Sequence, residues 1–407
     1  MKYITKRILI GLVLAFSAMT MLNSCNKDVV EPEQPAYVAP TGLALGETIA
    51  ATADDSLYYK LIIKSGLLTT MNTKTNTFTM FVPNNAAMRS FINLISGGAT
   101  VGYTDAQYVA FINSAAVSAA TAGGIVSYNM IPQSINFASV PSTFPNWFYP
   151  TNLNPTSGSS FNPLVRLTTS PSTRNGNWVN NVPLVAVNTL TANGYVHTSG
   201  AVATPPSQFL WDRVNVDADM TYLKAAVQRA DSGVLVTSSS SLQWALSNLG
   251  PNLNLFAPTN AAFQTLVFNM VYAQVFAATG NAALATTQAN LAVAAGPAFL
   301  ASNSVTTTLV KGIVVYHLMG ARAFLNNFPT TATAYPTLLN GAIPAHPGVT
   351  LTATFTGNVV TSATVKGAAN ATASTIAINP LPTPLGTSDQ HFINGTLHKI
   401  NQVLLPQ

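Results

Sequence analysis

The sequence predicts an α+β protein that contains two copies of one domain, and three observations carry this prediction. Three short blocks recur in the same order in the two halves of the chain, as in proteins built from repeated domains. Several stretches show the helical spacing of apolar residues, and others alternate apolar residues with Thr or Ser, which predicts helices and half-exposed strands. The length of 407 residues gives each copy enough chain for its own core.

The repeat rests on blocks whose separation grows regularly. The spacing between equivalent blocks is 175, then 188, then 201 residues, and steps of 13 are expected of loop insertions in the second copy. The domain boundary is predicted near Pro205-Pro206. The matched blocks are 81–88 (FVPNNAAM) with 256–263 (FAPTNAAF), 128–132 (YNMIP) with 316–320 (YHLMG), and 193–197 (NGYVH) with 394–398 (NGTLH).

Local patterns in the second copy predict its elements. Apolar residues at helical spacing indicate helices at 223–230 and 242–249. A short strand is expected at 253–257, followed by a helix that Thr259 or Asn260 caps. A further helical stretch covers 305–318. Alternating runs at 349–355 and 359–365 indicate a hairpin, and Asn175-Gly176 marks an equivalent turn in the first copy.

The N-terminus is predicted to contain an export signal and a lipid anchor. Residues 1–24 combine three basic residues with the apolar run 8–21, the pattern of a secretory signal peptide. Cys25, the only cysteine, follows in Leu-Asn-Ser-Cys, which resembles the lipobox of bacterial lipoproteins. We therefore expect an acylated Cys25 and a flexible tether over 25–47, with Lys27-Asp28 resembling a surface-export signal. The alternative is a free cysteine in an ordinary signal peptide.

Charge and composition exclude several classes. The chain is 48% hydrophobic and 7% charged, which argues against intrinsic disorder. Outside 8–21 the apolar residues are interrupted by Thr, Ser, Asn, Gly and Pro, so a bundle of membrane helices is excluded. Removing the signal reduces the formal charge from +5 to about +2, and the remaining basic residues form no cluster. Nucleic acid is therefore not an expected partner.

The repeated blocks resemble the two conserved boxes and the central Tyr-His segment of the fasciclin (FAS1) domain. The resemblance covers 207–407, and 48–206 is a more divergent copy with Asn84, Asn129 and Gln133-Ser134 at positions where the family has Thr, His and Arg. It implies two FAS1-like domains, each a twisted β-sandwich or wedge flanked by helices. It also implies an extracellular adhesion role, and it points to Tyr316, His317 and Tyr128 as candidate ligand contacts. The alternative for the Tyr-His pair is a buried pair that holds helix to sheet by hydrogen bonds.

A second candidate surface is aromatic. Residues 144–149 (FPNWFY) lie in a stretch rich in Pro, Asn, Ser and Gly. Trp147, Phe148, Tyr149 and Trp178 are candidates for a platform that stacks on sugar rings. The alternative is that these rings fold back and form a small buried cluster.

The sequence predicts a binding protein and no enzyme. No nucleophile elbow, phosphate loop or pair of acidic residues is found in a catalytic pattern, and no metal site or cofactor is expected. We expect a lipid-anchored adhesion protein of a Gram-negative cell envelope, in the outer membrane and exposed at the surface, that contacts protein or glycan. We expect the protein to be attached to the membrane through the lipid on Cys25. The alternative is a glycan-capture accessory of an outer-membrane nutrient-uptake system.

Overall fold

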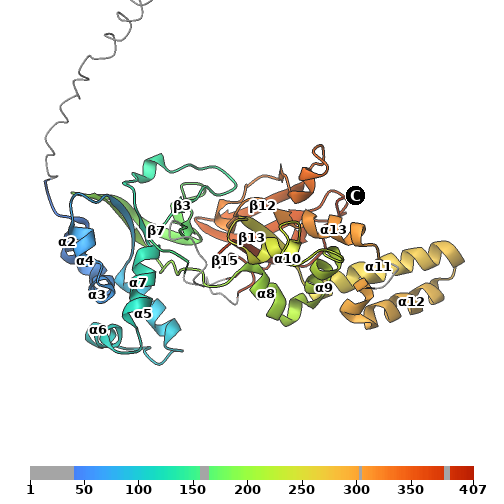
Figure 1. Cartoon of the computed structure of the whole chain (residues 1–407), viewed down its shortest axis with the longest axis horizontal. Helices are drawn as coiled ribbons and strands as arrows, with labels where there is room; N and C mark the ends of the chain where they lie inside the picture. Colours follow the sequence, from blue (N-terminus) through green and yellow to red (C-terminus); the bar gives the residue numbers. More distant parts are fainter. Residues whose placement is uncertain (1–40, 156–164, 302–304, 380–385) are drawn as a thin grey trace, which may run out of the picture. The chain divides into compact units, whose positions relative to one another are not determined.

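The structure is a computed structural model that describes residues 41–155, 165–301, 305–379 and 386–407 (Figure 1). Residues 41–407 form one compact unit. The predicted signal peptide, Cys25 and the tether up to residue 40 lie outside the described residues. Helix α2 (Leu45–Ala51) begins inside the predicted tether, because Leu45 and Ile49 are fully buried.

The first repeat places helices before a six-stranded sheet. In this sheet the strand order is β2-β1-β8-β7-β6-β5, and β3 pairs separately with β4. Its elements are α2, η2 (Ala53–Asp55), α3 (Ser56–Ser65), α4 (Leu68–Asn72), β1 (Phe78–Pro83), α5 (Asn85–Ile95), α6 (Asp105–Asn113), α7 (Ala119–Tyr128), β2 (Met130–Ile131), η3 (Phe137–Ser139), β3 (Tyr149–Pro150), β4 (Thr168–Thr169), β5 (Pro171–Ser172), β6 (Trp178–Val179), β7 (Val182–Thr191) and β8 (Gly194–Ser199).

The second repeat follows the same order with longer helices and a larger second sheet. Its two sheets have the orders β10-β9-β16-β15 and β11-β12-β13-β14. Its elements are α8 (Leu210–Val216), η4 (Ala218–Met220), α9 (Thr221–Ala230), α10 (Leu242–Ser247), β9 (Leu253–Pro258), α11 (Asn260–Thr279), α12 (Ala282–Ala294), η5 (Gly296–Ala301), α13 (Thr307–Tyr316), β10 (Leu318–Met319), η6 (Leu325–Asn327), β11 (Thr333–Tyr335), η7 (Leu338–Gly341), β12 (Val349–Thr356), β13 (Val359–Lys366), β14 (Ser374–Thr375), β15 (Gln390–Phe392) and β16 (Gly395–Ile400). The α+β fold class is confirmed.

Strand pairing shows the repeat directly. In the first repeat β1 runs parallel to β8, with Phe81 opposite His197, and β2 is antiparallel to β1. In the second repeat β9 runs parallel to β16, with Phe256 opposite His398, and β10 is antiparallel to β9. The first and third sequence blocks are therefore the two strands of one parallel pair, which the intervening helices connect.

The repeated Asn-Gly block fastens the last strand to the first helix. The Asn193 side chain accepts from Leu45 N at 2.8 Å and donates to Met71 O at 2.9 Å. The equivalent Asn394 accepts from Leu210 N at 3.0 Å and donates to Ala245 O at 3.1 Å. Each amide thus satisfies one buried N–H at a helix start, which has no partner within the helix, and one carbonyl near a helix end.

Most predicted elements are confirmed, and one expectation is corrected. Thr259 caps α11 by accepting from Ala262 N, and the hairpins of β12 with β13 and of β5 with β6 form as predicted. Asn175 and Gly176 both have positive φ, as a tight hairpin turn requires. The 13 residues added between the first two blocks do not form a loop. They lengthen helices, because α11 has 20 residues where α5 has 11, and α12 has 13 where α6 has 9.

Candidate functional site

The Tyr-His segment is buried in the second repeat. Tyr316 ends α13 and its hydroxyl donates to Gly348 O and accepts from Ala368 N. His317 Nδ1 donates to Ile313 O at 2.8 Å, and its Nε2 accepts from Leu404 N at 2.8 Å. Burial lowers the pKa of His317 to about 4, so the ring is neutral. Tyr316 ties α13 to residues 348 and 368, and His317 ties it to the C-terminal segment. Both side chains are almost fully buried and offer no surface to a ligand.

The repeated histidines are also structural. His197 Nε2 donates to Ile135 O, and His398 Nε2 donates to Ala323 O. Their Nδ1 atoms accept from Asn188 N and Asp389 N. Burial lowers the pKa of both rings to about 4. The same bonds occur in both copies. Each ring therefore joins the last strand of its repeat, β8 or β16, to two neighbouring backbone segments.

Asp389 has the most strongly raised carboxyl pKa of this region. Burial raises it to about 7, while its Oδ1 accepts from Leu325 N at 2.8 Å. A shifted carboxyl next to histidines is a common sign of catalysis. Here the equivalent position in the first repeat is Asn188, which also has positive φ and also accepts through Oδ1, from Phe137 N. Because an amide fills the same place, the role of Asp389 is structural.

Tyr128, the third candidate, lies where the two repeats meet. Its hydroxyl contacts His391 Nδ1 of the second repeat at 3.2 Å, donates to Thr168 O and accepts from Asn180 Nδ2. Burial raises its pKa to about 12. The ring is 1% exposed, so Tyr128 is a joint between repeats and no ligand contact.

Arg322 continues this chain of hydrogen bonds. Its Nη1 donates to His391 Nε2, its Nη2 to Ile393 O and its Nε to Asn252 Oδ1. Since Nε2 accepts, Nδ1 carries the proton of His391 and donates to Tyr128. Burial lowers the pKa of Arg322 to about 10 and that of His391 well below its usual value, with the Arg322 charge as the second cause for the histidine.

We call the contact between the two repeats the seam. It consists of residues 128, 143–146 and 168–180 of the first repeat and residues 322–328, 335 and 389–393 of the second. Asn327 accepts from Ser172 Oγ at 2.7 Å and donates to Thr143 O at 2.8 Å. Phe144 meets Phe328 and Tyr335 edge to face, at ring-centre distances of 5.4 and 4.5 Å. The seam is thus both polar and aromatic.

A small cavity opens beside the seam. Its volume is about 80 Å³, and Asn180, Gln208, Asp389 and His391 are among its lining residues. Pockets for drug-sized ligands begin at roughly 300 Å³, so this cavity has room for a few waters. In the described ranges, no group of three His, Cys, Asp or Glu side chains is placed to hold a metal ion.

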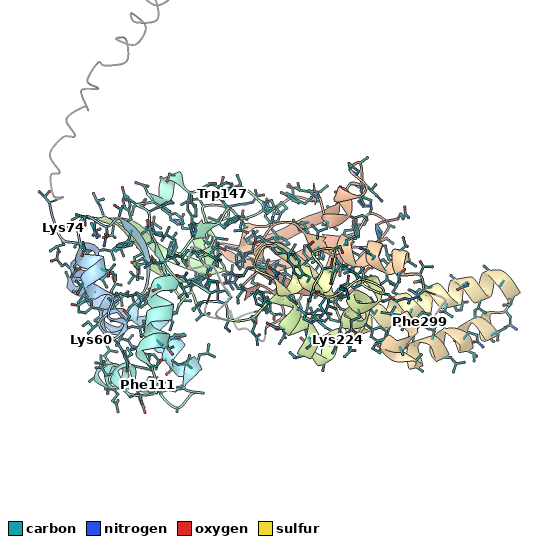
Figure 2. All side chains as sticks on the ribbon, viewed as in Figure 1. Lys60, Lys74, Phe111, Trp147, Lys224 and Phe299 are labelled. Atoms are coloured by element: carbon teal, nitrogen blue, oxygen red, sulfur yellow. The ribbon has the colours of Figure 1, made fainter. Side chains whose placement is uncertain are left out.

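The aromatic segment divides between the interior and the surface. Trp147 and Phe148 are 57% and 47% exposed, and their rings are nearly parallel at 6.3 Å. Figure 2 labels Trp147 at the rim of the molecule. Tyr149 is half-buried, and Trp178 is buried with its Nε1 donating to Asn175 O. The structure therefore brings two of the four predicted platform residues together at the surface.

Sequence reasoning did not identify Arg322 and His391 as joint residues. One signal was present: Arg322 stands where the first copy has Gln133-Ser134. Arg322 therefore has no charged counterpart in the first copy. The periodicity of apolar residues does not reveal such a joint, because the seam brings together residues that are far apart in the sequence.

Comparison with known proteins finds a similarity to the fasciclin domain in part of the chain. The family model for the fasciclin domain matches residues 54–205, which is the copy expected to be the more divergent. No curated protein matches. Among solved structures, the chain is similar to a FAS1 domain pair from the insect cell adhesion molecule fasciclin I, with 13% identity and a TM-score of 0.32. The similarity covers 86% of this chain and 97% of that one.

Proposed function

We propose that this chain is a non-enzymatic binding protein of a Gram-negative cell envelope, held in the outer membrane by a lipid on Cys25 and exposed at the cell surface. The fasciclin domain at 54–205 supports an adhesion role, since the domain occurs in a cell adhesion molecule. The lipobox-like sequence that ends at Cys25 supports the anchor. Its ligands are extracellular protein or glycan.

The exposed pair Trp147–Phe148 carries the binding proposal. The Tyr-His segment, Tyr128 and Trp178 are buried, so they do not meet a partner in this conformation. Large exposed aromatic rings favour binding because they bury much apolar area at a low cost in side-chain entropy. We therefore assign the primary contact to Trp147 and Phe148.

Glycan capture for a nutrient-uptake system is the second candidate, and the ring geometry favours it. Two nearly parallel rings 6.3 Å apart give an extended apolar surface. The apolar faces of neutral sugars stack on such surfaces without an ion pair. The scarcity of charge in this chain suits a neutral ligand.

An array of glycans and extracellular proteins, probed with the chain from residue 25 onward carrying Cys25→Ser, tests the binding proposal. For each glycan or protein on the array that binds the wild type, we expect the Trp147→Ala/Phe148→Ala double variant to bind about tenfold more weakly, or weaker still. Leu190→Ala is the matched control, because Leu190 is 72% exposed and lies elsewhere on the first repeat. Equal affinity of the double variant and the wild type would remove the pair from the proposal.

The anchor is tested separately. In a Gram-negative host the full chain is expected to incorporate labelled fatty acid and to accumulate as an uncleaved precursor when the lipoprotein signal peptidase is inhibited. Cys25→Ser is expected to abolish both effects. Label that persists in Cys25→Ser would contradict the anchor.

A further inference from the structure

Helices α11 and α12 form a hairpin of unusual composition. They lie side by side and are joined at Gly280, whose positive φ ends α11 (Figure 1). From Ser232 to Val310 the sequence contains no Asp, Glu, Lys, Arg or His. A surface helix of a soluble protein normally carries charged residues on its outer face, and neither helix does.

Most of α11 is nevertheless outside the core. It is long and apolar enough to cross a membrane, yet only 17% of its most apolar window is buried. Its buried residues Ala262, Phe263 and Val267 lie in its first half. The sequence of α11 is not a continuous apolar run, because Gln, Thr and Asn interrupt it.

Exposed apolar side chains occur around the hairpin and not on one face. Met270 and Phe276 are 39% and 44% exposed, and six residues at 100° each place them about 120° apart on the helix. On α12, Leu284 and Leu291 are 41% and 60% exposed. Ala285 and Ala289 are buried, so α12 uses its small residues against α11 and leaves its larger ones outside.

An aromatic ladder runs along α11. The rings of Phe268, Tyr272 and Phe276 are nearly parallel, with centre distances of 6.0 and 5.9 Å. At the base of the hairpin lies a cavity of about 30 Å³ whose lining is entirely apolar and includes Phe263, Met270 and Phe299. The apolar character therefore continues from the core outward along the helix.

We propose that the α11–α12 hairpin inserts into the interfacial layer of an uncharged lipid bilayer. The exposed apolar side chains lie around the hairpin, and lipid can cover all of them. A second copy of the chain would cover the side chains on one face and leave those on the opposite face in water. The stretch has no Asp, Glu, Lys, Arg or His side chain to desolvate, and charge is what hydrocarbon excludes most strongly. Because α11 and α12 themselves carry no Lys or Arg, no attraction to anionic headgroups is expected.

Vesicle flotation tests this surface without the lipid anchor. The chain from residue 25 onward with Cys25→Ser is mixed with vesicles of phosphatidylcholine, or of phosphatidylcholine with added phosphatidylglycerol. We expect equal binding to both, unaffected by salt, and a loss of about tenfold or more in Phe276→Asp/Leu291→Asp. Leu235→Asp is the control, since Leu235 is 77% exposed on the same repeat outside the hairpin. Circular dichroism verifies that the variants stay folded.

Several outcomes would overturn the proposal. These are no flotation of the wild type, equal loss in Leu235→Asp, or binding that requires phosphatidylglycerol. A lipid-free dimer that Phe276→Asp/Leu291→Asp dissociates, with no vesicle binding, would assign the hairpin to a second copy. None of these results bears on the acylation of Cys25, which the Cys25→Ser protein lacks.

Discussion

At the scale of single residues, both copies depend on a glycine where two backbones touch. Gly194 has a φ of 144°, and an added Cβ would collide with Phe78 O. At the equivalent Gly395 it would collide with Leu253 O. These glycines begin the strands that pair in parallel with β1 and β9. The Asn-Gly blocks found by self-similarity are therefore sites of close backbone approach.

We predict that Gly194→Ala and Gly395→Ala each lower the free energy of unfolding by about 3 kcal/mol or more, because rigid backbone must shift. Gly312→Ala is the control. It lies inside α13 with no atom near the added methyl group, so the helix gains about 0.5 to 1 kcal/mol. Urea denaturation measures all three, and a neutral Gly395→Ala would contradict the assignment.

Asp389 gives a pH-dependent prediction. Its pKa is about 7 in the folded chain, against 3.8 for an aspartate in its ordinary, solvated state. Between these two values the folded state therefore binds more protons than the unfolded state. This residue therefore costs stability as the pH rises through that range. Asp389→Asn keeps the Oδ1 acceptor, as the equivalent Asn188 does, and removes the charge.

We expect Asp389→Asn to be more stable than the wild type by about 2 to 4 kcal/mol above pH 7. The difference should shrink towards about pH 4, where both folded and unfolded carboxyls become protonated. Urea midpoints of the two proteins across this range measure it. A difference that is independent of pH, or a less stable variant at high pH, would contradict the buried carboxyl.

At the scale of elements, one asparagine in each copy joins two helix starts. Asn85 Oδ1 accepts from Leu57 N at 2.9 Å, and its Nδ2 donates to Ala53 O at 3.0 Å. Asn260 makes the equivalent bonds to Tyr222 N and Ala218 O. The first sequence block thus fixes α5 on α3 and α11 on α9.

We predict that Asn85→Ala destabilises the protein by about 2 kcal/mol, because the buried Leu57 N–H and the partly buried Ala53 carbonyl lose their partner. Ser90→Ala, on the exposed side of the same helix, should change stability by less than about 0.5 kcal/mol. Thermal unfolding of both variants is the measurement. Equal melting temperatures would show that the asparagine does not join the helices.

The sequence predicted these elements well because each leaves a local trace. Apolar spacing located α9 and α10, Thr259 marked the start of α11, and Asn175-Gly176 marked a turn. The repeated blocks were found from the sequence, whereas the parallel pairing of their strands is seen only in the structure. The seam was not predictable in this way, since Tyr128 and His391 are 263 residues apart. Burial of the Tyr-His segment and of Trp178 likewise depends on tertiary packing.

At the scale of the whole molecule, a comparison of two buried tyrosines shows how the seam differs from an ordinary core. The hydroxyl of Tyr128 has three hydrogen-bond partners, one of them across the seam. The hydroxyl of Tyr58, in α3, is buried with no partner among the described residues. Both rings are almost fully buried.

We predict that Tyr128→Phe lowers stability by about 2 to 4 kcal/mol, because it leaves buried partners on both repeats unsatisfied. Tyr58→Phe removes an unpaired hydroxyl and should be neutral or stabilising. Urea unfolding of the two variants against the wild type gives both values. Equal losses would mean that the seam bonds contribute nothing beyond the packing of the rings.

The central claim is that the two repeats fold as one unit joined at the seam. Differential scanning calorimetry of the chain from residue 25 onward, with Cys25→Ser, tests it most directly. We predict one transition whose calorimetric and van't Hoff enthalpies agree, at a lower temperature in Tyr128→Phe. Two separate transitions in the wild type, with neither moved by Tyr128→Phe, would contradict it.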